Sequence, residues 1–286
     1  NSDLILFAFD CNNQPIPFLN NTLISGQLYN GIAFPPVLIS QENQGSLIVW
    51  SKGLTGINNE IRVQQIVNDQ FISGQGIVVA DSSSHSLKYI VHHSPKSILY
   101  QDGFPLLKLM RISGTGNLQS QIITISDQFM GNCRVEETSM GTLVVWQEYV
   151  NGVFKMRANL FDEELNPLYG NEGTPVPTAG HYTDFNMMVD NNILYLVSLS
   201  EDHSFSPHLT SYSIQTNNLV PLWNSNYYPV FLSDEMENPS EMSFIKINNG
   251  FMGISRYCHD SIQDISCFSF DQWPNISPAD SLLAAN

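Results

Sequence analysis

The sequence contains few basic residues. Among 286 residues there are 11 Lys and Arg against 27 Asp and Glu, which gives a formal net charge of −16. Binding to nucleic acid or to an anionic membrane requires cations that neutralise phosphates, so this composition argues against both partners. The chain also lacks a run of about 20 apolar residues, the length that a membrane-spanning helix needs. We therefore expect neither a nucleic-acid-binding protein nor one that is inserted in a membrane.

Cysteines are also few. The chain has four, Cys11, Cys133, Cys258 and Cys267, and none forms a CxxC pair, which argues against a zinc site and against a thioredoxin-type site. Cys258 and Cys267 fall on the two arms of a hairpin expected over residues 251–270, with its turn near 260–262. A symmetric hairpin would place them opposite each other, at a Cα separation that a disulfide spans. We name Cys258 and Cys267 as a disulfide candidate, with two reduced thiols as the alternative, and expect Cys11 and Cys133 to be unpaired.

One hairpin pattern recurs along the chain. An apolar strand at Leu143–Trp146 is followed by the Gly-containing turn Tyr149–Gly152 and a second strand at Val153–Phe161. Similar pairs of strands occur at residues 46–67, 97–112, 193–214 and 251–270. The aligned positions are Trp50, Tyr100, Trp146, Val197 and Ser255, in steps of 50, 46, 51 and 58 residues. Trp50 and Trp146 are expected to pack as core aromatics.

Each hairpin has the same neighbours. A turn and a fourth strand follow it, and a short apolar strand precedes it, at residues 35–40, 86–92, 133–139, 184–190 and 241–247. Four short strands in about 45–50 residues is the repeat of a β-propeller blade. A β-sandwich or a β-solenoid would give no reason for this period. The sequence therefore predicts an all-β fold, a β-propeller of about six four-stranded blades, with five or seven as alternatives.

The whole chain, residues 1–286, is expected to form a single propeller. Its repeat units fall approximately at residues 1–30, 31–82, 83–128, 129–179, 180–234 and 235–286. The first unit shows only the second half of the pattern. Its strands are expected either to belong to an incomplete blade or to close the ring by pairing with the last blade.

A more specific pattern lies within residues 141–179. An apolar run ends in Val145-Trp146, Glu148 follows, and after the next strand come Asp162, Asn166 and the stretch Tyr169–Gly173. This pattern resembles a repeat of large exported proteins of the Bacteroidetes group. The resemblance implies a propeller scaffold of secreted or cell-surface proteins, many of them exported by type IX secretion. It implies no activity, because function on a scaffold depends on a site.

No catalytic motif stands out. Sialidase-type Asp boxes and the GxSxG and HExxH motifs are absent from the sequence. A glycoside hydrolase needs two carboxylates that face each other across the sugar. The candidates on first strands are Glu136, Glu137 and Asp184, with Glu241 at the start of a later one. The alternative is that these carboxylates are simply solvated.

The sequence gives little support for a metal site. The seven histidines are His85, His92, His93, His181, His203, His208 and His259. His92 and His93 are adjacent on a strand and should point to opposite faces, which argues against a shared metal. The acidic loop at 234–237 offers oxygen ligands for calcium but lacks the alternating pattern of a calcium loop. We expect no metal and no cofactor.

The sequence thus favours a non-catalytic propeller, secreted or on the surface of a bacterial cell, that acts as an interaction, structural or adhesion module. Its expected partner is another cell-surface protein or a glycan. The alternative is a carbohydrate-active propeller, either a lectin or a glycoside hydrolase.

Overall fold

The computed structural model of the chain describes residues 2–6, 14–15, 22–28, 36–41, 45–53, 59–68, 70–72, 76–80, 88–113, 119–176, 182–200, 206–222, 228–229, 239–247, 250–259 and 262–271. Within these ranges all regular elements are β-strands. None of the described residues belongs to a helix that is long and apolar enough to span a membrane. The chain divides into two compact units, Asn1–Phe129 and Met130–Asn286, and each is described by itself.

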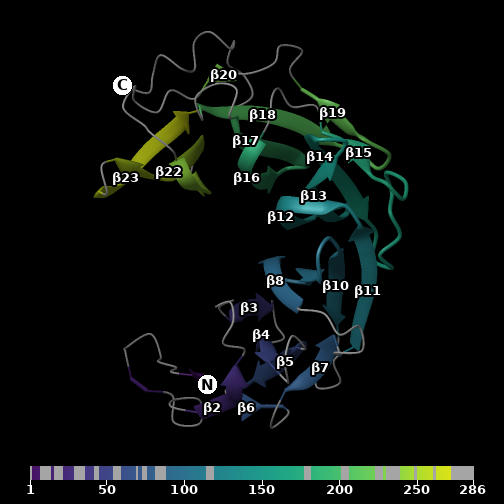
Figure 1. The fold of residues 1–286 in the computed structure, drawn as a ribbon, viewed down its shortest axis with the longest axis vertical. Helices are drawn as coiled ribbons and strands as arrows, with labels where there is room; N and C mark the ends of the chain where they lie inside the picture. Colours follow the sequence, from purple (N-terminus) through teal and green to yellow (C-terminus); the bar gives the residue numbers. More distant parts are fainter. Residues whose placement is uncertain are drawn as a thin grey trace. The chain divides into compact units, whose positions relative to one another are not determined.

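Two sheets make up the first unit. The first sheet contains β1 (Ser2–Leu6), β2 (Thr22–Leu28), β3 (Val37–Gln41), β4 (Gly45–Gly53), β5 (Asn59–Val67), β6 (Gln70–Phe71) and β7 (Ile77–Ala80). The second sheet contains β8 (Lys88–His93), β9 (Ser97–Asp102), β10 (Leu107–Ser113) and β11 (Gln119–Ser126), paired in the order β11-β10-β9-β8 (Figure 1). In the second sheet each strand pairs antiparallel with the one that precedes it in the chain.

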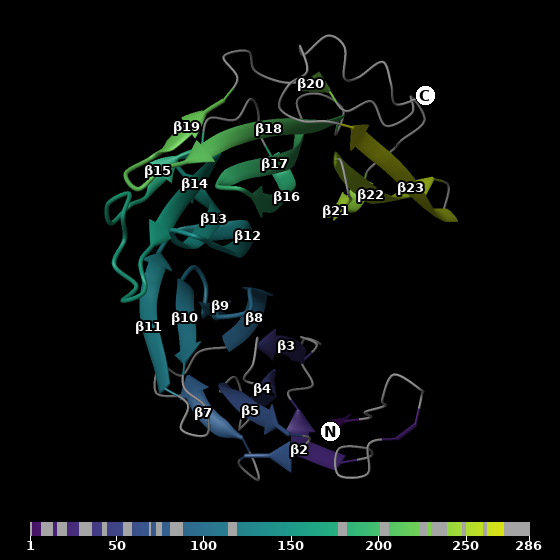
Figure 2. The ribbon, with the colours of Figure 1, turned by 180° about the vertical axis from the view of Figure 1, so that it is seen from behind.

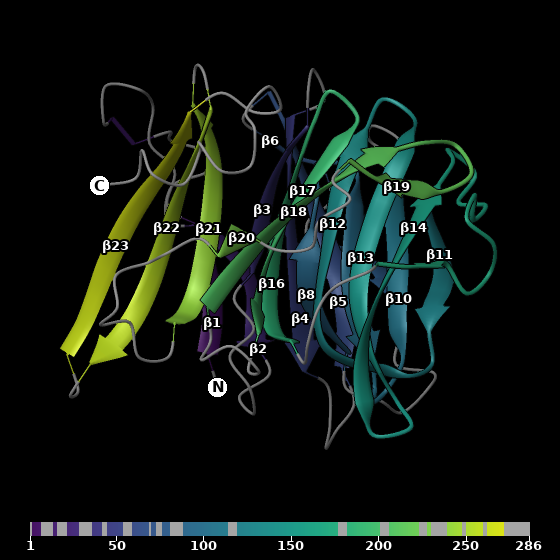
Figure 3. The ribbon, with the colours of Figure 1, turned by 90° about the horizontal axis from the view of Figure 1, so that it is seen from above.

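Three sheets make up the second unit. The third sheet contains β12 (Phe129–Thr138), whose first residue belongs to the first unit, β13 (Gly141–Val150), β14 (Val153–Phe161) and β15 (Thr174–Pro175). The fourth sheet contains β16 (Tyr182–Asp190), β17 (Ile193–Ser200), β18 (Ser206–Ile214), β19 (Leu219–Pro221) and β20 (Tyr228–Pro229) (Figure 2). The fifth sheet contains β21 (Pro239–Ile247), β22 (Gly250–His259) and β23 (Ile262–Asp271), which lie side by side in Figure 3.

The repeated unit is a four-stranded antiparallel meander. The second and third sheets have four strands each, in chain order, and the fourth sheet extends the same path β16-β17-β18-β19 with β20 beside β18. This is the blade of a β-propeller. The predicted all-β fold class is confirmed, and the first strands β3, β8, β12, β16 and β21 lie where the apolar pattern predicts them. The single propeller over residues 1–286 and its repeat boundaries stay a prediction.

The described N-terminal strands pair with each other and with the first sheet. β1 pairs with β2, and β2 joins the first sheet by the single pair Leu28 with Lys52 of β4. These strands therefore extend the first sheet along the edge of β4.

The hairpin of β13 and β14 is tighter than its sequence suggests. Its strands pair as far as Val150 with Val153, which leaves only Asn151 and Gly152 in the turn. Both turn residues have positive φ, 56° for Asn151 and 83° for Gly152. This is the geometry of a type I′ turn, for which Asn-Gly is the preferred pair because its twist matches that of the strands.

The register expected for the last hairpin is wrong. Cys258 pairs with Gln263 and Cys267 pairs with Ile254, so the two cysteines lie four residues apart along the ladder. At about 3.4 Å per residue, their Cα atoms are more than 10 Å apart, beyond the reach of a disulfide. The geometric argument for a Cys258–Cys267 disulfide therefore does not hold. Cys133 is a buried free thiol, as expected, and Cys11 lies outside the described residues.

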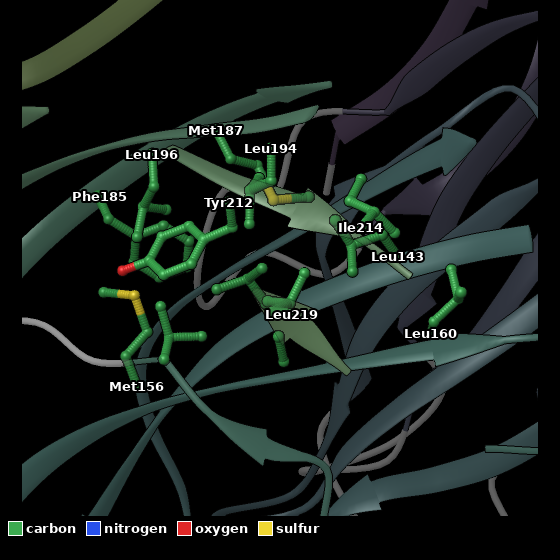
Figure 4. Close-up of a cluster of buried hydrophobic side chains, with 13 residues drawn as sticks. Leu143, Met156, Leu160, Phe185, Met187, Leu194, Leu196, Tyr212, Ile214 and Leu219 are labelled. Carbon is green, nitrogen blue, oxygen red and sulfur yellow. The ribbon is translucent and has the colours of Figure 1, made fainter. Parts of the chain in front are cut away.

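Each unit has a core between neighbouring sheets. In the second unit, apolar side chains of β13 and β14 pack against side chains of β16, β17 and β18, and Met156, Phe185 and Tyr212 lie close together there (Figure 4). In the first unit, Val49 and Val63 of the first sheet share a cluster with Met110 of the second. Trp50 and Trp146 are each 1% exposed, which confirms them as core aromatics.

Candidate functional site on the first strands of the third and fourth sheets

Arg134 lies in the middle of β12, an edge strand of the third sheet. Its Nη1 donates a hydrogen bond of 2.9 Å to the Cys133 carbonyl and one of 3.4 Å to Asn132 Oδ1. Its Nε donates to Asn186 Oδ1 of β16 at 3.4 Å, and its guanidinium carbon lies 5.7 Å from the centre of the Phe185 ring. The guanidinium is therefore held between two edge strands by amides and an aromatic ring.

β12 and β16 run in the same direction at this contact. Arg134 touches Phe185 and Asn186, and five residues later the Ser139 hydroxyl donates to Asn192 Oδ1 at 2.8 Å. The contacts advance together along both strands. Asn132, Arg134 and Glu136 alternate with Cys133 and Val135 on β12, so these three polar side chains point to the same face, toward β16. All three, and Asn186, are half-buried.

Glu136 has an unusual carboxyl group. Burial, and to a smaller extent the neighbouring charge of Glu137, together raise its pKa from 4.5 to about 7. Glu137 accepts a hydrogen bond of 3.0 Å from the Thr142 hydroxyl on β13. Glu136 can therefore hold a proton near neutral pH, as a general acid must.

The sequence candidates for a carboxylate pair lie at different positions along their strands. Glu136 and Glu137 lie near the end of β12, whereas Asp184 lies near the start of β16. Since β12 and β16 run in the same direction, their backbones offset Asp184 from both glutamates along the strands. Glu241 is on β21, and the side chains of Asp184 and Glu241 lie outside the described residues.

The structure contradicts the expected placement of His92 and His93 on opposite faces of their strand. The rings of His92 and His93 stack with centroids 6.1 Å apart and planes at 25°, so the strand does not separate them as expected. Burial lowers the pKa of His93. Among the described residues, no three His, Cys, Asp or Glu side chains form a group that could hold a metal ion. The acidic loop at 234–237 lies outside the described residues.

Other charged side chains form buried clusters against the aligned aromatics. In the third sheet, Trp146 Nε1 donates to Glu148 Oε1 at 2.9 Å, and Arg157 Nε lies 2.7 Å from Glu148 Oε2. Arg157 is the cross-strand partner of Trp146. Gly173, at φ +66°, lies over the indole, where an added Cβ would be 2.7 Å from Trp146 Cη2.

The first two sheets repeat this arrangement. In the first sheet Arg62 is opposite Trp50, pairs with Glu60 and donates to the Gly76 carbonyl, and Gly76 lies over the Trp50 ring. In the second sheet Lys108 is opposite Tyr100 and pairs with Asp102, which also binds the buried Lys88 at 3.1 Å. The Lys108–Asp102 and Arg157–Glu148 pairs join strands two and three of their sheets, and the Lys88–Asp102 pair joins strands one and two. The Arg62–Glu60 pair lies within β5.

The residues that carry the family resemblance also serve the fold. Asp162 accepts hydrogen bonds from the backbone of Glu164 and Asn166, at 3.0 and 2.7 Å, and so closes the turn after β14. Leu165 has a positive φ of 62° in this turn. Tyr169 donates from its hydroxyl to the Gln215 carbonyl of the fourth sheet at 2.9 Å. The pattern at 141–179 is therefore a blade-building pattern.

The sequence analysis missed Arg134 and Asn186. The available signal is the alternation of polar Arg134 and Glu136 with apolar Cys133 and Val135 on an apolar first strand. That signal marks a polar face but does not identify the contact with Asn186, which is 52 residues away.

Comparisons with known proteins identify no family for this chain. No protein-family model matches the chain, and no curated protein matches its sequence. Among solved structures, polysaccharide lyase Uly1 is similar over 84% of this chain and 58% of that one, with 9% identity and a TM-score of 0.49. A candidate 6-phosphogluconolactonase from Bacteroides fragilis is similar over 93% of this chain and 76% of that one, with 11% identity and a TM-score of 0.45. The chain thus spans less than two thirds of the length of the lyase.

Proposed function

We propose that this chain is a non-catalytic β-propeller module, secreted or on the surface of a bacterial cell, that binds another surface protein or a glycan. One observation carries the proposal. The first-strand carboxylates lie at different positions along their strands, with Glu136 and Glu137 near the end of β12 and Asp184 near the start of β16. The ion pairs beside Tyr100 and Trp146 support it further, because they join neighbouring strands of a blade.

The extracellular location and type IX export rest on the pattern at 141–179 and on the low content of basic residues. Protease treatment of intact cells of the native host tests the location. Digestion of the chain without cell lysis is the expected result, and full protection in intact cells would contradict it.

The catalytic question has a direct test. The purified chain is incubated with a panel of neutral and acidic polysaccharides, and new reducing ends and unsaturated products are measured. We expect no turnover. Turnover that is lost in Glu137→Gln or Asp184→Asn would overturn the non-catalytic proposal.

A second candidate function, a carbohydrate-active enzyme, is favoured by one specific observation. Burial and the charge of Glu137 raise the pKa of Glu136 to about 7, which suits a proton donor. In that case the activity should fall in Glu136→Gln, and its rate should decrease as pH rises through about 7 because the acid loses its proton.

A further inference from the structure

The polar face of β12 has the features of a binding site. Asn132, Arg134 and Glu136 point to one face, Asn186 of β16 meets Arg134 there, and all four side chains are half-buried. β12 and β16 are both edge strands of their sheets. This row of polar side chains lies between two edge strands and is partly open to solvent. Contacts among its members hold it in place.

Arg134 is oriented in advance of any ligand. Its 2.9 Å bond to the Cys133 carbonyl and its position 5.7 Å from the Phe185 ring centre hold the guanidinium plane. Its contacts to Asn132 and Asn186 are 3.4 Å long, beyond the usual 2.7–3.2 Å of a protein hydrogen bond. Such long contacts can be exchanged for shorter ones to a ligand, at little cost in side-chain entropy because the arginine is already fixed.

The chemistry of the row suits hydroxyl groups. Arg134 and the two Asn amides offer N–H donors, and Glu136 offers a carboxyl group. The Asn186 Oδ1 atom already accepts from the Met187 N–H at 2.8 Å, so the acceptor of the row is Glu136. A sugar ring carries several hydroxyls, each of which can donate and accept. The formal net charge of −16 disfavours a polyanionic chain at long range.

We infer that Asn132, Arg134, Glu136 and Asn186 form a binding site for a neutral glycan, with Arg134 as the central donor. This inference rests on the proposed binding function and names its ligand class and location. The site lies within the second unit, between the third and fourth sheets.

Affinity electrophoresis of the whole chain tests the inference. Gels contain laminarin, galactomannan or, as the acidic comparison, polygalacturonate, and the shift in mobility gives the affinity. We expect retardation by at least one neutral polysaccharide and at least a tenfold loss of affinity in Arg134→Ala. Lys155→Ala is the matched control, because Lys155 is an exposed cation on β14 of the same sheet, and it should bind as the native chain does.

Two further variants separate binding from folding. Asn132→Ala removes one amide of the row, and Arg134→Lys keeps the charge but loses the planar donor fork. Both should fold, as judged by an unchanged far-ultraviolet spectrum, and both should bind at least threefold more weakly. These results would support the site even where Arg134→Ala does not fold.

The outcomes distinguish the inference from the proposed function. Retardation that none of the variants weakens would overturn this site and leave a glycan-binding module. Binding to polygalacturonate alone would overturn the neutral ligand class. The absence of retardation in all gels would overturn the site, whereas the module could still bind a protein. Degradation of the polysaccharide would overturn the non-catalytic function itself.

Discussion

Glu148 shows how a single carboxylate supports a blade. It accepts from the buried Trp146 indole and pairs with Arg157, which also lies 4.0 Å from the exposed Glu172 carboxylate. Removing Glu148 leaves the buried Trp146 N–H and the half-buried Arg157 guanidinium without this acceptor. The resulting loss of folding free energy is several times larger than the loss from breaking a surface ion pair.

We therefore expect Glu148→Ala to lower the free energy of unfolding by about 3 kcal/mol, and Glu172→Ala to lower it by less than about 1 kcal/mol. Urea unfolding followed by tryptophan fluorescence measures both. Glu172 is the matched control, since its side chain is 89% exposed and faces the same arginine. Equal effects of the two variants would show that the Glu148 cluster is not a stabilising unit.

Glu136 should make stability depend on pH. Its pKa is raised from 4.5 to about 7, so the folded chain binds a proton more tightly than the unfolded chain. The stabilising contribution of the protonated form is complete below about 4.5 and is lost as pH rises through about 7.

At pH 8 the native chain buries a charged Glu136 carboxylate, whereas a glutamine at this position stays neutral. We therefore expect Glu136→Gln to be more stable than the native chain at pH 8, by about 1–2 kcal/mol, and similar to it near pH 4. Urea midpoints at the two pH values measure the difference. Glu163→Gln, an exposed position, should show no such pH dependence. A Glu136→Gln variant that is less stable than the native chain at pH 8 would contradict the assigned burial of this carboxyl.

At the scale of elements, the Cys258 register has a chemical test. In the variant with Cys267→Ser and Gln263→Cys, the thiols at positions 258 and 263 sit at paired positions of β22 and β23. Paired Cα atoms are about 4.5–5.5 Å apart, within disulfide range. We expect this variant to form the new disulfide on mild oxidation, whereas the native Cys258 and Cys267 do not bond to each other. Peptide mapping without reductant reads both results, and a native Cys258–Cys267 bond would refute the observed register.

The positions of the strands were predictable from the sequence, but the pairing register of β22 with β23 was not. Apolar runs and the Asn151-Gly152 turn mark β13 and β14 because alternation and turn chemistry are local properties. In the last hairpin the expected turn near 260–262 agrees with a ladder that continues to His259 paired with Ile262. The pairing of the two cysteines was wrong because it required a turn centre between residues 262 and 263. The observed centre, midway between residues 259 and 262, lies two residues earlier, and this shifts the pairing by four.

The site was only half predictable for a related reason. Glu136 and Glu137 can be identified as first-strand carboxylates from the sequence, but their distance from Asp184 depends on how β12 packs beside β16. That packing is set by contacts such as Arg134 with Asn186 and Ser139 with Asn192, which join residues more than 50 positions apart. No local pattern contains this information.

At the scale of the whole molecule, the charge balance determines how binding should respond to salt. With 27 acidic and 11 basic residues, the chain attracts cationic partners and repels polyanions at long range. A neutral glycan has no charge to screen. Its affinity should therefore change by less than about twofold between about 0.05 M and about 0.5 M sodium chloride, where the Debye length falls from above about 10 Å to below about 8 Å.

A cationic surface protein would behave differently, since steering by opposite charges weakens steeply with ionic strength. For such a partner we expect affinity to fall by more than about tenfold over the same range, mainly through slower association. Surface plasmon resonance with the chain immobilised measures both kinds of partner on one surface. Arg134 is held by a hydrogen bond and a ring contact, and it would bind a neutral glycan through hydrogen bonds. We therefore expect Arg134→Ala to lower glycan affinity by the same factor at both salt concentrations. Glycan binding that collapses at high salt would show that charge, and not the hydroxyl chemistry of this row, drives recognition.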